Sequence, residues 1–264
     1  MQLFFREAAP RLPCSRKLAL VSALMCLPPL QASAATTWDL ATGFDYSTGK
    51  YGAASDTSIL SIPFGWRMQM ERVRLELTVP YLDVHGPGSF ASGVVVGGNN
   101  AITTRTGIGD VTAGAAWILN KDAGSLPGIE LAGTVKVPSA PSTLGTGKFD
   151  YSVAANLNHN ITPRVMLFGS VGYQWLSDYR GINLENGVTA LGGLNYRSSD
   201  TTNIGFSANF RETYYRPLEN QFSLTPYMLW TFAPHWRVSL YGLAGFTNSS
   251  PSVGGGARLI FFQQ

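Results

Sequence analysis

Residues 71–81, ERVRLELTVPY, alternate between apolar and polar side chains from Arg72 onward. The odd-numbered positions from Val73 to Tyr81 are apolar, whereas the even-numbered positions carry Arg72, Arg74 and Glu76. Because successive side chains of an extended strand point to opposite faces, one face of this segment is apolar and the other is charged. Segments of about 9–11 residues with this pattern are typical of strands that cross a lipid bilayer at a tilt.

The same alternation recurs along the chain, in segments bounded by Gly, Pro, Asn, Asp and Ser. The predicted strands cover residues 37–47, 58–70, 71–81, 110–119, 128–137, 149–158, 165–175, 187–197, 203–212, 221–231, 235–246 and 253–262. Their predicted outer faces carry no charged residue. A charge that faces lipid at mid-membrane costs about 2–4 kcal/mol, so this segregation indicates a membrane-facing surface. The sequence therefore predicts an all-β fold: a single antiparallel transmembrane β-barrel of about twelve strands, of outer-membrane type.

The first 34 residues have the features of a secretory signal peptide. A basic segment that ends at Lys17 precedes an apolar core at residues 18–30, and Ala32-Ser33-Ala34 forms a small-x-small cleavage pattern. The apolar core is shorter than the roughly 20 residues that a spanning helix needs. We therefore predict a signal peptide at residues 1–34, a barrel at residues 35–264, and a location in the outer membrane of a Gram-negative bacterium.

Cysteine content and charge exclude several classes of function. Both cysteines, Cys14 and Cys26, lie in the predicted signal peptide, so the remaining chain has no thiol for a disulfide, a metal site or a nucleophile. Four of the 19 basic and one of the 16 acidic residues also lie there. The remainder is formally neutral, so its charge gives no reason to expect a nucleic-acid partner.

Short and long connections alternate between the predicted strands, as in bacterial barrels with short periplasmic turns and longer external loops. The short connections lie near residues 69–71, 120–127, 159–164, 198–202 and 233–234. The longer ones lie near residues 48–57, 82–109, 138–148, 176–186, 213–220 and 247–252. The longest, 82–109, is rich in Gly, Val and Asn and could fold into the pore mouth. Aromatic residues at both strand ends predict two interfacial girdles.

Catalytic and metal-binding chemistry has little support in the sequence. The three histidines are His85 in the longest loop and His159 and His235 near short turns. None has a hydroxyl nucleophile and an orienting acid beside it in the sequence, as a hydrolytic triad requires. No group of His, Asp or Glu shows metal-ligand spacing. We therefore predict no enzymatic activity, no catalytic residue, no metal and no cofactor.

The charged residues that remain are predicted to line the lumen. We call the part of the lumen toward the periplasmic turns the lower lumen. It is predicted to hold Arg67, Arg72, Arg74, Glu76, Glu130, Arg197, Arg237 and Arg258. The predicted upper rim holds Asp110, Lys136, Asp150 and Arg211. A group of arginines in a pore could favour anionic solutes. The alternative, which we favour, is that they pair with Glu76 and Glu130 and fill a narrow lumen.

Several short segments resemble the outer-membrane transporter family of the MetA-pathway of phenol degradation. They are Ile62-Pro63-Phe64-Gly65, Val79-Pro80-Tyr81-Leu82, Gly107-Ile108-Gly109-Asp110-Val111, Val135-Lys136-Val137-Pro138, Leu144-Gly145-Thr146-Gly147-Lys148-Phe149-Asp150-Tyr151 and Val171-Gly172-Tyr173. The resemblance implies an outer-membrane barrel that takes up small, aromatic compounds, and it implies no catalytic residue. The glycines of the third and fifth segments are predicted to let the chain turn into the next strand.

These features predict a channel for passive uptake of small solutes, with aromatic and anionic compounds as the candidate classes. A twelve-stranded barrel is narrower than the wide porins, so only small solutes would pass. Expected partners are outer-membrane lipid, the solute and the barrel assembly machinery during biogenesis. Two alternatives stay open: a barrel enzyme that acts on lipid, and a structural or adhesive surface barrel.

Overall fold

A computed structural model describes residues 36–87, 89–91, 94–96, 102–122, 126–178, 182–216 and 218–263. The predicted signal peptide at residues 1–34 lies outside the described residues. Within them, no helix is long and apolar enough to cross a membrane. The strands are β1 (Thr37–Gly49), β2 (Thr57–Gln69), β3 (Val73–Gly86), β4 (Ser89–Ala91), β5 (Val94–Val96), β6 (Thr103–Ile108), β7 (Val111–Asn120), β8 (Gly128–Val137), β9 (Asp150–Asn160), β10 (Val165–Trp175), β11 (Gly187–Arg197), β12 (Thr202–Arg211), β13 (Gln221–Ala233), β14 (Trp236–Gly245) and β15 (Val253–Gln263).

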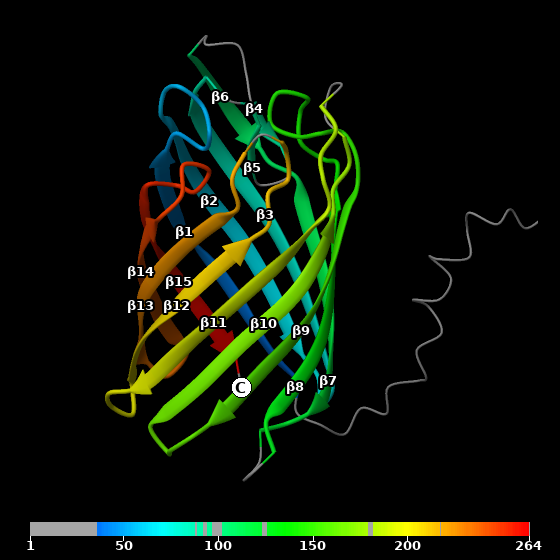
Figure 1. Cartoon of the computed structure of the whole chain (residues 1–264). Helices are drawn as coiled ribbons and strands as arrows, with labels where there is room; N and C mark the ends of the chain where they lie inside the picture. The colour runs from blue at the N-terminus through cyan, green and yellow to red at the C-terminus, as the bar shows by residue number, and fades with distance from the viewer. Residues whose placement is uncertain are drawn as a thin grey trace, which may run out of the picture. The chain divides into compact units, whose positions relative to one another are not determined.

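The main sheet closes into an antiparallel barrel of tilted strands (Figure 1). Strand β1 pairs with β2 on one side and with β15 on the other, so the first and last strands close the barrel. Strands β6 and β7 both pair with β3, one on each half of it, and so form a single interrupted strand. The barrel therefore has twelve strand positions, as the alternation predicts. Closure leaves no unpaired sheet edge in the lipid, which a spanning sheet requires.

The fourth strand position differs from the prediction. Strand β3 continues to Gly86 and pairs with β6 from Tyr81↔Ile108 to Gly86↔Thr103. The connection therefore spans residues 87–102, not 82–109, and carries the separate β4–β5 hairpin. Residues 103–108, TTRTGI, lack apolar–polar alternation. Periodicity does not detect this strand because its position is set by the ladder with β3.

Short and long connections lie at opposite ends of the barrel (Figure 1). The turn end holds connections 70–72, 121–127, 161–164, 198–201 and 234–235, together with the start of β1 and the end of β15. The loop end holds connections 50–56, 87–102, 138–149, 176–186, 212–220 and 246–252. This arrangement agrees with the alternation of short and long connections in the sequence.

The apolar residues of each alternating strand face the outer surface of the barrel. Large exposed side chains include Leu40 and Phe64 on neighbouring strands and Val171 near the middle of β10. Aromatic rings gather toward strand ends: Tyr173 and Trp175 lie 5.0 Å apart at one end, and Trp236 and Phe261 lie 5.1 Å apart at the other. An apolar band between two aromatic zones is the surface of a membrane-spanning barrel.

Three prolines occupy the interiors of described strands, and each interrupts the ladder on one side only. At Pro80 the ladder of β3 skips from Thr78↔Thr112 to Tyr81↔Ile108. Pro63 pairs with Pro80 of β3, but the β1–β2 ladder skips from Thr42↔Phe64 to Asp45↔Ser61. Pro226 pairs with Phe206 of β12, and the β13–β14 ladder skips the corresponding positions. Since proline has no N–H to donate, a local break in the ladder at each proline is the expected cost, and the barrel stays closed around it.

Candidate functional site

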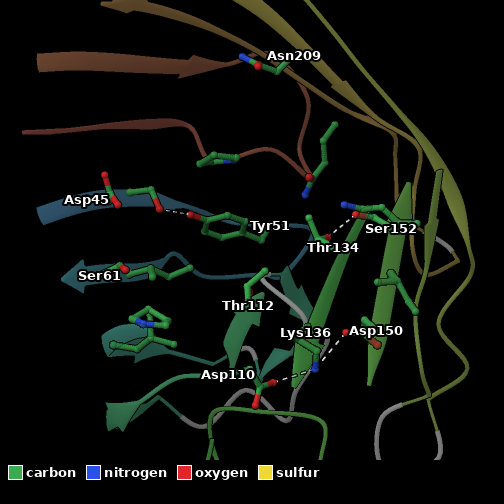
Figure 2. Close-up of a pocket in the computed structure, with 18 of the residues that line it drawn as sticks. Asp45, Tyr51, Ser61, Asp110, Thr112, Thr134, Lys136, Asp150, Ser152 and Asn209 are labelled. Carbon is green, nitrogen blue, oxygen red and sulfur yellow. Dashed lines mark hydrogen bonds and ion pairs between the residues drawn. The ribbon is translucent and has the colours of Figure 1, made fainter. Parts of the chain in front are cut away.

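The loop-end half of the lumen contains a cavity of about 740 Å³ (Figure 2). Its lining comes from β1, β2, β3, β7, β8, β9, β10, β12, β13 and β14, so most strands around the barrel contribute to it. Ten of the lining residues are Ser, Thr, Asn or Gln, and four are charged. The cavity is the candidate functional site, because a ligand-sized space with a few placed polar groups is the usual form of such a site.

A buried ion-pair cluster lies in the wall of this cavity. The Lys136 ammonium lies 2.8 Å from Asp110 Oδ2 and 3.1 Å from Asp150 Oδ2, and all three side chains are largely buried. Figure 2 shows the Lys136 amine between the two carboxylates. Register explains the meeting, because Lys136 pairs with Thr112 of β7 on one side and with Asp150 of β9 on the other. The structure thus brings together three of the four predicted upper-rim residues.

This cluster also holds the connection between β8 and β9 against the lumen wall. Lys136 Nζ donates to Thr146 Oγ1 at 2.8 Å, and the Ala140 N–H donates to Asp110 Oδ1 at 2.9 Å. A Cβ on Gly145 would lie 2.9 Å from both Asp110 carboxylate oxygens, so only glycine allows this close approach. The ion pairs and the loop are therefore one unit.

An apolar contact completes the attachment of the same connection. Leu144 is almost fully buried and packs in one cluster with Leu82 and Val84 of β3, with Ile59 and Ala140 beside them. The longest connection was the candidate for folding into the pore mouth, but the inward packing that the described residues show belongs to residues 138–149. The sequence does contain a sign of this packing. The lumen-facing positions of β3 are apolar at Leu82 and Val84, and apolar side chains inside a watery lumen need other apolar side chains to pack against them.

A second polar cluster lies closer to mid-barrel. Asp45 Oδ2 lies 2.9 Å from Arg258 Nη2, and Asp45 Oδ1 accepts a 2.6 Å hydrogen bond from the Tyr241 hydroxyl. Gly256 pairs with Asp45 on one side and with Tyr241 on the other, which leaves space between the two side chains across β15. Arg258, predicted in the lower lumen, is therefore paired with a residue of the cavity lining.

The lower lumen holds a chain of charges that neutralise one another. Arg67 lies 3.1 Å from Glu76 and 3.9 Å from Asp39. Arg74 lies 2.7 Å from Glu76 and binds both oxygens of Glu130 in a two-pronged contact. Two-pronged arginine–carboxylate contacts are strong and directional. We name the side chains of Asp39, Arg67, Arg74, Glu76 and Glu130 the lower belt.

The other predicted lumen arginines are dispersed. Arg72 is exposed in the turn before β3, and Arg197 is exposed at the end of β11, so neither joins the lower belt. Arg237 donates to Thr231 Oγ1 at 3.2 Å and lies 4.9 Å from the Phe262 ring centroid. Arg211 lies 5.2 Å from the ring centroid of Tyr214 and also interacts electrostatically with Asp150 of the Lys136 cluster.

The loop-end connections also pack on one another, which the sequence does not indicate. Leu184 and Tyr214 form a buried cluster with Leu176 and Leu218 against them, and the Glu185 N–H donates to the Tyr214 carbonyl at 2.8 Å. Burial raises the pKa of the Tyr214 phenol to about 12. The loops are thus a packed layer beside the cavity.

The histidines show no catalytic arrangement in the described residues. His85 Nδ1 lies 2.8 Å from Thr104 Oγ1, but both side chains are exposed on the outer parity of β3 and β6, and no described carboxylate or amide contacts the ring. His159 lies 3.0 Å from Asp122, and His235 contacts the Phe262 carbonyl at 3.1 Å. A hydrolytic triad needs nucleophile, base and orienting group together. The described residues also hold no group of three or more metal-ligating side chains.

Comparison with known proteins gives a likeness of fold. No family model and no curated protein matches the chain. A crystal structure of an outer-membrane channel from Pseudomonas putida F1 matches with a TM-score of 0.65 and 13% identity, covering 90% of this chain and 100% of the other. The NanC porin matches with a TM-score of 0.53 and 11% identity, over 86% of this chain and 100% of its own. The KdgM porin matches with a TM-score of 0.52 and 9% identity, over 84% of this chain and 98% of its own. The chain therefore has the fold of outer-membrane β-barrels.

Proposed function

We propose that this protein is an outer-membrane channel through which small solutes pass by diffusion. The observation that carries the proposal is the cavity of about 740 Å³ inside a closed barrel whose outer surface is apolar. A filled barrel without internal space would serve as an anchor or a scaffold. A barrel that encloses a polar-lined space of this size can admit a small molecule.

The names of the structural neighbours support the same proposal. One is a channel, and two others are porins. At identities of 9–13% they do not assign a solute to this chain. The motifs of the MetA-pathway transporter family, quoted above, are a separate support, and we propose membership of that family on those motifs.

The proposal places the protein in the outer membrane of a Gram-negative bacterium. Residues 1–34 would direct export and be removed, and the barrel assembly machinery would insert the remaining chain. The loop end would face outward and the turn end the periplasm, as in barrels of this type. Outer-membrane lipid would contact the apolar band between the aromatic zones.

We further propose that the lower belt stabilises the lumen instead of selecting anions. Each of its arginines already contacts carboxylates, and the belt contains three carboxylates and two guanidinium groups. A ring that selects anions requires uncompensated positive charge. The belt lacks it.

Reconstitution tests the channel function directly. The purified barrel in planar lipid bilayers should give discrete conductance steps, and in liposomes it should allow swelling with small sugars that falls steeply with solute size. Absence of both, from protein that is shown to be folded by its heat-dependent shift on an SDS gel, would remove the proposal.

A further inference from the structure

We propose that the cavity in the loop-end half of the lumen binds uncharged solutes that carry hydroxyl groups and disfavours anions; this inference rests on the proposed channel function. Most polar residues of the lining are uncharged. Ser, Thr, Asn and Gln side chains reach the cavity from strands all around the wall, for example Ser61 of β2, Thr112 of β7, Gln174 of β10 and Asn209 of β12. Such side chains both donate and accept hydrogen bonds, as a hydroxyl group of a solute also does.

Part of this hydrogen-bonding capacity is unused by the protein. In the described residues, the side chains of Ser61, Thr112 and Gln174 make no hydrogen bond or ion pair with another group. By contrast, Thr134 and Ser152 bond each other at 2.6 Å, as the dashed line in Figure 2 shows. Polar groups inside a protein need a partner, so the three unused side chains contact water or a solute in the cavity.

The charged groups of the lining are already compensated. Lys136 lies between Asp110 and Asp150, and Asp45 is held by Arg258 and Tyr241. Among the described lining residues an entering anion would find no uncompensated cation, because the one ammonium that they include contacts two carboxylates. Counting Arg258 and Arg211, which interacts electrostatically with Asp150, with the four charged lining residues gives three carboxylates and three cations, so the cavity has no net charge that would attract an anion.

Aliphatic side chains give the cavity a complementary character. Ile59, Leu82 and Leu144 line it near the attached connection, and Leu243 lines it on β14. A molecule with hydroxyl groups on one part and C–H groups on another fits such a mixed lining, because both kinds of surface find a partner. A small sugar or a phenol has this character, and a carboxylate does not.

The test uses three solutes of nearly equal size: D-glucose, D-gluconate and D-glucosamine. In planar bilayers that contain the full-length mature barrel, glucose should reduce the single-channel current in a saturable way. Gluconate should need at least about a tenfold higher concentration for the same reduction. Glucosamine should lie between them, because a cavity without net charge does not offset the lost hydration of its ammonium group either. Equal effects of all three, or no effect of any beyond that of viscosity, would overturn the inference while leaving the channel intact.

Variants assign the effect to the cavity. A triple variant removes the unused hydrogen-bonding groups with little change of volume; it combines Ser61→Ala, Thr112→Val and Gln174→Leu. The glucose concentration that gives half of the maximal reduction in single-channel current should rise at least about fivefold. Thr42→Val, on the outer parity of β1, is the matched control and should leave it unchanged. If the triple variant does not fold, the wild-type comparison of the three solutes decides alone. A barrel that gives no conductance at all would instead contradict the proposed function.

Discussion

Lys136 shows how one residue can connect the wall of the barrel to a connection at its loop end. Its ammonium contacts Asp110 just before β7, Asp150 at the start of β9 and Thr146 in the connection between β8 and β9. A buried charge is tolerated only where such partners surround it. Removing the lysine therefore affects both the wall and the connection.

We expect Lys136→Met to lower the free energy of unfolding by about 3–5 kcal/mol, because two buried carboxylates would remain side by side without a cation. Urea unfolding in lipid vesicles, followed by tryptophan fluorescence, measures this difference. Lys148→Met is the matched control, since Lys148 is exposed in the same connection, and its effect should stay within about 0.5 kcal/mol. Equal effects of the two variants would contradict the assigned role.

The lower belt gives a second contrast between neighbouring residues. Arg74→Met leaves Glu130 without its two-pronged partner, so we expect a loss of about 3 kcal/mol and a shift of the reversal potential toward cations. Arg72→Met changes an exposed side chain in the adjacent turn and should change neither quantity. The same planar-bilayer and urea measurements report both. A shift caused by Arg72→Met, or a loss of stability equal to that of Arg74→Met, would contradict the difference between the exposed turn residue and the paired belt residue.

At the scale of elements, the loop end is held by contacts between connections that are distant in sequence. Residues 176–186 and 212–220 meet at Leu184 and Tyr214, and Gly52 of the first connection donates to the Asn248 carbonyl of the last at 2.8 Å. Such contacts favour one arrangement of the loops above the cavity.

The Tyr214 phenol makes this layer sensitive to high pH. Since its pKa is raised from 10.0 to about 12, its contribution to stability is complete below pH 10 and is lost as the pH rises toward 12. We expect the two connections to loosen between these values, with increased proteolysis at residues 176–186. Tyr214→Phe should remove the pH dependence of cleavage in that range. Unchanged dependence in the variant would assign the transition to another group.

At the scale of the whole molecule, the position of the membrane follows from the exposed apolar band. Val171 and Val253 are both exposed on the outer face, but Val171 lies near the middle of β10 and Val253 lies at the loop end of β15. If lipid surrounds the barrel, the same substitution at the two places should have very different consequences.

We expect Val171→Arg to destabilise the barrel by about 2–4 kcal/mol and Val253→Arg by about 0–1 kcal/mol, because the penalty for a charge falls from the bilayer centre to the interface. Urea titration in vesicles provides both values. Similar values for both variants, or a larger one for Val253→Arg, would show that the band is not the membrane-spanning surface.

The sequence by itself determined the class of fold. Alternation in ERVRLELTVPY and its repetitions placed all twelve strand positions, since a strand that lies between lipid and water must separate its residues by parity. Connection lengths also gave the two ends of the barrel. Alternation did not detect residues 103–108, because they join the barrel only through the ladder with β3.

Only the tertiary structure decided how the lumen is arranged. Parity places Arg74, Lys136 and Asp150 on the inner face, but barrel stagger decides which of them meet, and stagger is a property of all strands together. For the same reason the sequence did not show that residues 138–149 pack inward or that Tyr214 is buried. Strand periodicity is local, whereas each of these contacts joins residues that only the closed barrel brings within reach.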